Sequence, residues 1–103
     1  MRFLRFLMIE TDKAEKMVQV SDKMWASPPP GIEIKFNYAC LGIAFPGQPP
    51  NTIVSVSVIE AESAETIAAT SYPLTLAGGT MWTVPALEVP VGKATEVEKK
   101  ARG

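Results

Sequence analysis

The segment Thr52–Ser63, TIVSVSVIEAES, combines the two local patterns that decide the fold. Val54, Val56 and Val58 alternate with serines, which predicts a β-strand with one apolar and one small, polar face, because side chains alternate along a strand. An alanine-rich stretch, ESAETIAATSY, overlaps its end and predicts a helix, and Ser63 stands where the N-cap is expected. The chain here passes directly from a strand into a helix.

The preceding half of the chain repeats this order of elements. Phe3–Ile9 predicts a strand with two largely apolar faces, and residues 11–27, TDKAEKMVQVSDKMWAS, predict an amphipathic helix. The segment SPPPG ends that helix, because three consecutive prolines cannot continue it. Ile32–Phe45 then predicts a long strand, and PGQPPN a turn that leads into the segment quoted above.

The chain after the second helix predicts a last strand, residues 80–91, TMWTVPALEVPV. Pro85 and Pro90 favour an edge position for this strand, since proline cannot donate a ladder hydrogen bond. The resulting order β-α-β-β-α-β is the ferredoxin-like pattern of the α+β class. It predicts a four-stranded antiparallel sheet in the order 4-1-3-2, with both helices on one face.

Two helices can cover only one face of such a sheet. We expect the covered face to carry Leu4, Phe6, Met8, Ile32, Ile34, Phe36, Val54, Val56 and Val58. The other face would then carry Phe3, Arg5, Leu7, Ile9, Glu33, Lys35, Asn37, Ser55, Ser57 and Ile59. Its apolar members would form an exposed patch in a monomer, which predicts a homodimer with the two helix-free sheet faces in contact.

Composition limits the chemistry available to the chain. Ten basic and eleven acidic side chains give a net charge of −1, so no nucleic-acid partner is expected. Histidine is absent, which excludes Ser-His and Cys-His catalysis and argues against a metal site. Cys40 is the single cysteine, which suits a reducing, cytoplasmic location. No segment is long and apolar enough to cross a membrane, and no cofactor is expected.

The length predicts one domain with a single core, residues 1–91. From Gly92 onward, four basic side chains stand against two acidic ones, a net of +2, so the remainder of the chain carries −3. Charged chain ends are usually frayed, and residues 92–103 are therefore expected to form a charged flexible C-terminal tail. An RNA or membrane-surface tether is the alternative interpretation of this basic segment.

The element order, the segment VSVIEAESAETIAA and the closing TVPALEVP resemble the dimeric α+β barrel superfamily, and within it a small uncharacterised single-domain family. The resemblance covers about residues 1–91 and implies a homodimer with a cleft between sheet and helices. The superfamily includes cofactor-independent monooxygenases, isomerase-like enzymes, haem proteins and members without known activity. The haem members use a histidine ligand that this chain lacks. The resemblance to the monooxygenases is carried by Trp25, Asn37 and Trp82.

Polar side chains on the predicted helix-free face are the candidate ligand-binding residues. If these side chains are buried, each polar group needs a hydrogen-bond partner. Together they could bind a small anionic or carbonyl compound, with Arg5 or Lys35 pairing with its charge. Trp82 is interpreted as either a dimer contact or a pocket wall. The candidate set is Arg5, Lys35, Asn37, Ser55, Ser57 and Trp82.

Two functions are left open by these residues. One is a homodimer that binds a small organic molecule between sheet and helices. The other is a cofactor-independent, monooxygenase-like or isomerase-like enzyme that acts on a small organic substrate by positioning it in a polar cavity. The alternative to both is a satisfied polar network, or a wet inter-sheet face, without any ligand.

Overall fold

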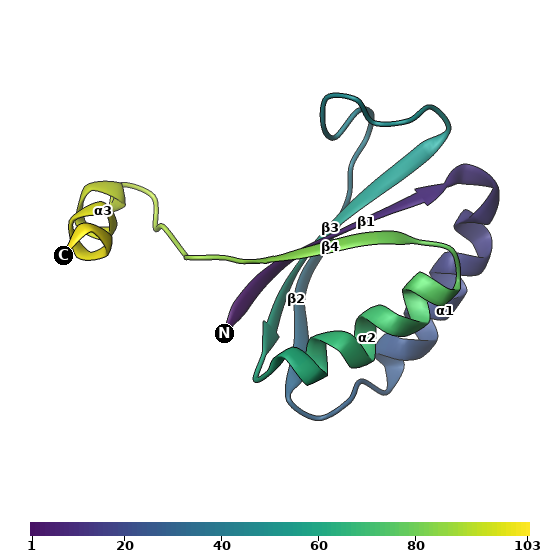
Figure 1. Ribbon diagram of the computed structural model, residues 1–103, viewed down its shortest axis with the longest axis horizontal. Coiled ribbons are helices and arrows are strands. Elements are labelled where there is room, and N and C mark those ends of the chain that lie inside the picture. The colour runs from purple at the N-terminus through teal and green to yellow at the C-terminus, as the bar shows by residue number, and fades with distance from the viewer.

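A computed structural model describes residues 1–103 (Figure 1). Four strands form one antiparallel sheet in the order β2-β3-β1-β4, which is the predicted order counted from the other edge. The predicted α+β fold class, with two helices on one face of the sheet, is confirmed. The strands are β1 Arg2–Glu10, β2 Ile32–Ala39, β3 Thr52–Ala61 and β4 Thr80–Pro85, and the helices are α1 Ala14–Ala26, α2 Ala64–Leu76 and α3 Ala94–Arg102, with a 3₁₀ turn at Thr11–Lys13.

Two strands are shorter than predicted. The strand β2 ends at Ala39, and residues 40–51 form a loop that contains the left-handed Gly42 and three prolines. The strand β4 lies at the predicted edge but ends at Pro85, so Pro90 is outside the sheet. The end of β4 coincides with Pro85, because proline removes a ladder donor and restricts the preceding residue.

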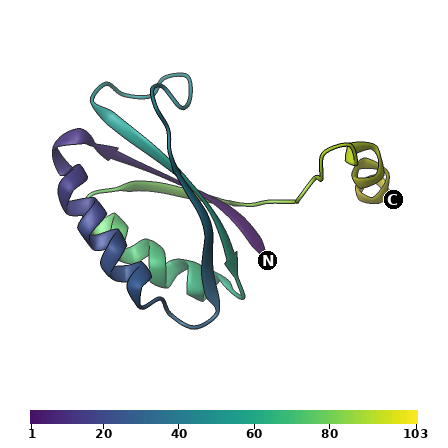
Figure 2. The same cartoon turned by 180° about the vertical axis from the view of Figure 1, so that it is seen from behind.

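Residues 94–102 form the helix α3, which buries no side chain. Figures 1 and 2 show it at the end of an extended segment, well away from the sheet and from the other two helices. Ion pairs between side chains one turn apart, such as Arg102 with Glu98 at 2.9 Å, accompany it. The helix therefore rests on local interactions, which are weak for so short a segment.

The core lies between the sheet and the two helices α1 and α2 (Figure 2). Its first part joins Ile9 to Met17 of α1 and Leu74 of α2. Its second part joins Ile59 of β3 to Ile67 of α2 and to Trp25, which was predicted to be a core residue. All residues of β1 and β3 in these two groups have odd numbers, so the odd-numbered side chains of these two strands point at the helices.

The predicted assignment of the two faces is therefore wrong for β1 and β3. Ile59 is fully buried in the core beneath the helices, although it was expected on the helix-free face. Ser57 shares its face, because side chains two positions apart on a strand point the same way. Val56 and Val58 consequently face away from the helices. Period-two alternation identifies which residues share a face. It does not identify the face that the helices cover, because both faces of these strands are apolar enough to be buried.

The strand β2 changes face along its length. Ile34 pairs with Ile59 of β3, but Phe36 pairs with Val58, so a register shift lies between them at Lys35. Such a bulge moves the following side chains to the opposite face. Ile32 and Ile34 thus lie under the helices as predicted, whereas Phe36 lies on the helix-free face, contrary to the prediction.

The helix α2 begins at the predicted cap. The Ser63 hydroxyl accepts a hydrogen bond from the Thr66 backbone N–H at 3.3 Å, and the Ser63 backbone is extended, as a cap requires. The helix continues through Pro73 to Leu76. Its position over β1 and β4 depends on where this first turn begins.

Replacing the cap should weaken the fold by a measurable amount. We expect Ser63→Ala to lower the free energy of unfolding by about 1 kcal/mol, because one helix donor loses its partner. The thermal midpoint should fall by about 4–8 °C in a domain of this size. Calorimetry or circular dichroism measures the change. The control is Ser27→Ala, at an exposed position whose side chain makes no hydrogen bond, and an equal loss there would contradict the capping role.

Candidate functional site

Arg5 lies at the centre of β1, between the sheet and α2, and only 2% of its surface is exposed. Its Nη2 donates hydrogen bonds to Thr70 Oγ1 at 2.7 Å, to Ser71 Oγ at 3.1 Å and to the Ile67 carbonyl at 3.3 Å. All three acceptors belong to one turn of α2. The guanidinium thus joins the central strand to the middle of the helix.

Arg5 forms no ion pair, and its Nε and Nη1 are buried without a hydrogen-bond acceptor. Buried arginines are normally paired with a carboxylate, because burial of a bare charge is costly. Desolvation by burial lowers the pKa of Arg5 to about 10. The group therefore stays charged at neutral pH, and its burial opposes folding until the pH rises past this pKa.

Four more polar side chains lie on the same face of the sheet as Arg5. Ser57 of β3 is its cross-strand partner, and the Ser57 hydroxyl donates to Asn37 Oδ1 at 2.9 Å. Ser55 lies one pair further along β3, opposite Leu7. On the other side, Thr83 of β4 pairs with Arg5. We call Arg5, Asn37, Ser57, Thr70 and Ser71 the Arg5 cluster.

The Thr70 and Ser71 hydroxyls accept from Arg5 and donate their own hydrogen bonds within α2. Thr70 and Ser71 donate to the Ile67 carbonyl at 3.1 and 2.8 Å. This hydrogen bonding to the preceding turn is common for hydroxyl side chains within helices. The unsatisfied groups of the cluster are therefore the Nε and Nη1 donors of Arg5. An acceptor with negative charge is the chemical partner that fits them.

An open cavity of about 340 Å³ lies beside the cluster, between the start of α2 and the strands β1 and β4. Ile67, whose carbonyl accepts from Arg5, and Thr83, which pairs with Arg5, both line it. The volume is near the lower end for small-molecule sites. The complete lining is Met1, Phe3, Ala61, Glu62, Ser63, Ala64, Ile67 and Thr83.

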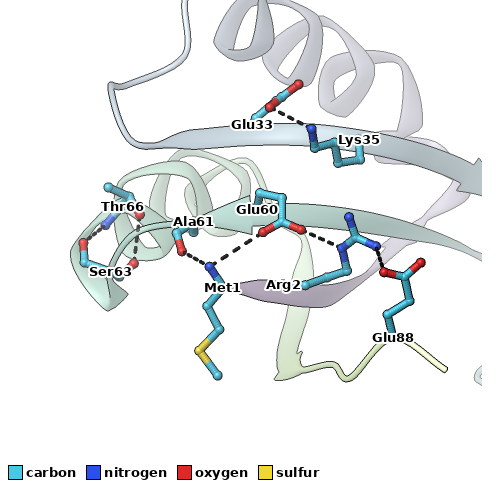
Figure 3. A network of polar contacts seen from close by, with 9 residues as sticks. All are labelled: Met1, Arg2, Glu33, Lys35, Glu60, Ala61, Ser63, Thr66 and Glu88. Atoms are coloured by element: carbon cyan, nitrogen blue, oxygen red, sulfur yellow. Dashed lines mark hydrogen bonds and ion pairs between the residues drawn. The ribbon is translucent and has the colours of Figure 1, made fainter. Parts of the chain in front are cut away.

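The structure divides the predicted site residues between two places. Arg5, Asn37, Ser55 and Ser57 share one face, but it is the helix-covered face and not the helix-free face as predicted, and Asn37 is exposed at its edge. Lys35 is separate, on the edge strand β2, where its Nζ lies 3.1 Å from the Glu33 carboxylate (Figure 3).

Trp82 lies on the opposite face of the sheet from the Arg5 cluster. Its ring stacks on Phe6 at 5.5 Å and meets Phe45 of the 40–51 loop edge-on at 5.7 Å. Phe6 and Trp82 are cross-strand partners, and Phe6 is on the helix-free face of β1. Trp82 is therefore not a wall of the cavity beside Arg5.

Sequence reasoning identified neither Thr70 nor Ser71 as a candidate site residue. The sheet-facing positions of α2 are Ile67, Thr70, Ser71 and Leu74, at the helical spacing of three and four residues. Two polar residues within an otherwise apolar stripe are the signal that could have revealed a buried polar partner on the sheet.

No family model and no curated protein matches this chain. Among solved structures, its fold is similar to that of a DUF3240 family protein from Shewanella baltica OS155, with a TM-score of 0.50 and 15% sequence identity. The match covers 85% of this chain and 92% of the other. At this identity the likeness supports the fold alone, so a function must be argued from the residues of this chain.

Two further structural findings bear on the class of site. No helix has the length and apolarity to cross a membrane. No three His, Cys, Asp or Glu side chains are grouped so that they could hold a metal ion. The buried polar side chains are one guanidinium and the hydroxyls of Ser57 and Thr70.

Removal of the unpaired charge should stabilise the protein. We expect Arg5→Met to raise the free energy of unfolding by about 1 kcal/mol or more, because an apolar side chain of similar length avoids the burial cost. Urea unfolding at neutral pH measures the difference. The control is Arg102→Met on α3, where a change within about 0.5 kcal/mol is expected for an exposed side chain. A less stable Arg5→Met protein would show that the guanidinium is adequately compensated.

Proposed function

We propose that the protein is a homodimer, joined through the helix-free faces of its sheets, that binds a small organic molecule between the sheet and α2. The observation that carries the binding role is the buried, unpaired guanidinium of Arg5 beside an open cavity. The association rests on a separate observation, the apolar character of the opposite face of the sheet.

The helix-free face carries apolar side chains on all four strands. Phe45 of the 40–51 loop packs on Trp82 there, and Val54 is fully buried. Phe36 and Tyr38 on β2 are 56% and 60% exposed, and Val84 on β4 is 41% exposed. Exposed apolar surfaces of this kind are typical of protein interfaces. The apolar members of this face are Leu4, Phe6, Met8, Phe36, Tyr38, Val54, Val56, Val58, Trp82 and Val84.

Charged side chains lie only at the border of this surface. Arg2 Nε donates to Glu60 at 2.6 Å and Arg2 also pairs with Glu88 at 3.6 Å, as Figure 3 shows. The hydrogen bond from Arg2 lowers the pKa of Glu60. An apolar centre with a charged rim is the usual anatomy of an interface between subunits. A two-fold axis through the centre would place identical apolar patches in contact.

The chemistry of the Arg5 cluster favours binding over catalysis. Its side chains are a guanidinium, an amide and three hydroxyls, which can hold and orient a ligand. None of them is a carboxylate, thiol or imidazole that could act as a general base near neutral pH. We therefore propose a binding protein, and the enzyme alternative would need a base from outside the cluster.

A charge placed in the apolar face should dissociate the dimer. We expect the wild-type protein to be dimeric in native mass spectrometry and in sedimentation, and Phe36→Glu to be monomeric, because a buried unpaired carboxylate is costly in an interface. The matched control is Val18→Glu on α1, since Val18 is also 56% exposed but lies away from this face. A monomeric wild-type protein would remove the proposed association.

Filling the cavity should abolish binding. Ala64 lines the cavity, whereas Ala68, one helical turn later, does not. We expect ligand-observed NMR with a library of small organic fragments to identify binders to wild type that Ala64→Trp no longer binds. The control Ala68→Trp should retain them, because both alanines are exposed positions of α2. Equal binding by the two variants would place the fragments elsewhere.

A further inference from the structure

We infer that the molecule bound beside α2 is an organic monocarboxylate, with its carboxylate against Arg5 and its apolar part in the adjoining cavity. This inference rests on the proposed function and adds the chemical class of the ligand. It is carried by the number of free donors at Arg5, by the apolar lining of the cavity and by an acidic side chain at its outer end.

The charge of the ligand follows from the hydrogen bonds of Arg5. A guanidinium has five N–H donors, and those of Nε and Nη1 have no acceptor. The acceptors that Nη2 finds on α2 are neutral hydroxyl and carbonyl oxygens. Asn37 and Ser57 satisfy each other across the strands. An entering carboxylate would supply the missing acceptor atoms and the missing negative charge together.

The organic part of the ligand follows from the cavity. Phe3, Ile67 and Ala64 contribute apolar surface along its wall, and Thr83 contributes a hydroxyl group next to Arg5. A bare inorganic anion could satisfy Arg5 but would leave this apolar surface in water. An alkyl or aryl chain attached to the carboxylate would bury it. The two parts of the site therefore fit the two ends of one organic acid.

Glu62 favours one negative charge over two. The Glu62 side chain is exposed and lines the cavity, and its carboxylate lies close to Gly31. A second carboxylate at the far end of the ligand would meet it as a like charge. Ile67 and Thr83 lie between the open cavity and the buried guanidinium, so side-chain movement of these two residues accompanies entry.

The test compares acids with neutral analogues of the same shape. Isothermal titration at neutral pH and fixed ionic strength would use the monocarboxylates from butanoate to octanoate with phenylacetate, the matching primary amides, adipate, and inorganic phosphate. The tightest monocarboxylate should bind at least ten-fold more tightly than its amide and than adipate. Arg5→Met should erase this preference, Arg5→Lys should retain part of it, and the exposed control Arg102→Met should retain all of it.

The possible results separate the carboxylate inference from the proposed function. Amides that bind as tightly as acids, in an Ala64→Trp-sensitive manner, would overturn the inference and leave the binding role in place. Phosphate binding that equals carboxylate binding and requires Arg5 would also overturn it, in favour of an inorganic anion site. If no acid, no amide and no fragment binds the wild-type protein, both the carboxylate inference and the proposed binding function are overturned. Thermal unfolding of each variant would show that it is folded before titration.

Discussion

Two helices cover one face of a four-stranded sheet, and both faces of its central strands are apolar. This constraint governs the rest of the molecule. Whichever face α1 and α2 cover, the other is left as a largely apolar face, which is typical of an interaction surface. The helices cover the face that carries Ile9 and Ile59, together with the one arginine of the strand interior. Val56 and Val58 of β3 are left half-buried on the helix-free face.

The covered face carries a consequence for Arg5. Its side chain is enclosed by α2 at a position where the nearby partners are hydroxyl and carbonyl oxygens. A charge buried in this way opposes folding unless an acceptor of opposite charge pairs with it. The burial of Arg5 beneath α2 is the reason both for the stability cost at this residue and for the binding proposed there.

Sequence reasoning predicted the element order, the strand order, the edge position of β4 and the Ser63 cap, because these follow from local patterns and from the handedness of connections. It also grouped Arg5, Asn37, Ser55 and Ser57 on one face. It placed Lys35 with them because the register shift at that residue cannot be read from alternation. It placed Trp82 on a possible pocket wall, although its ring stacks on Phe6 across the other face.

The sequence by itself determined the elements and which side chains share a strand face, since periodicity is a property of the backbone geometry alone. The tertiary structure decided which of two apolar faces the helices cover, because that choice depends on how side chains from distant segments fit together. It also decided that the serines of TIVSVSV lie beneath the helices beside a buried cation. The polar surroundings of these serines include Thr70 and Ser71, which accept hydrogen bonds from Arg5. These two residues belong to a helix that no local pattern places over Arg5.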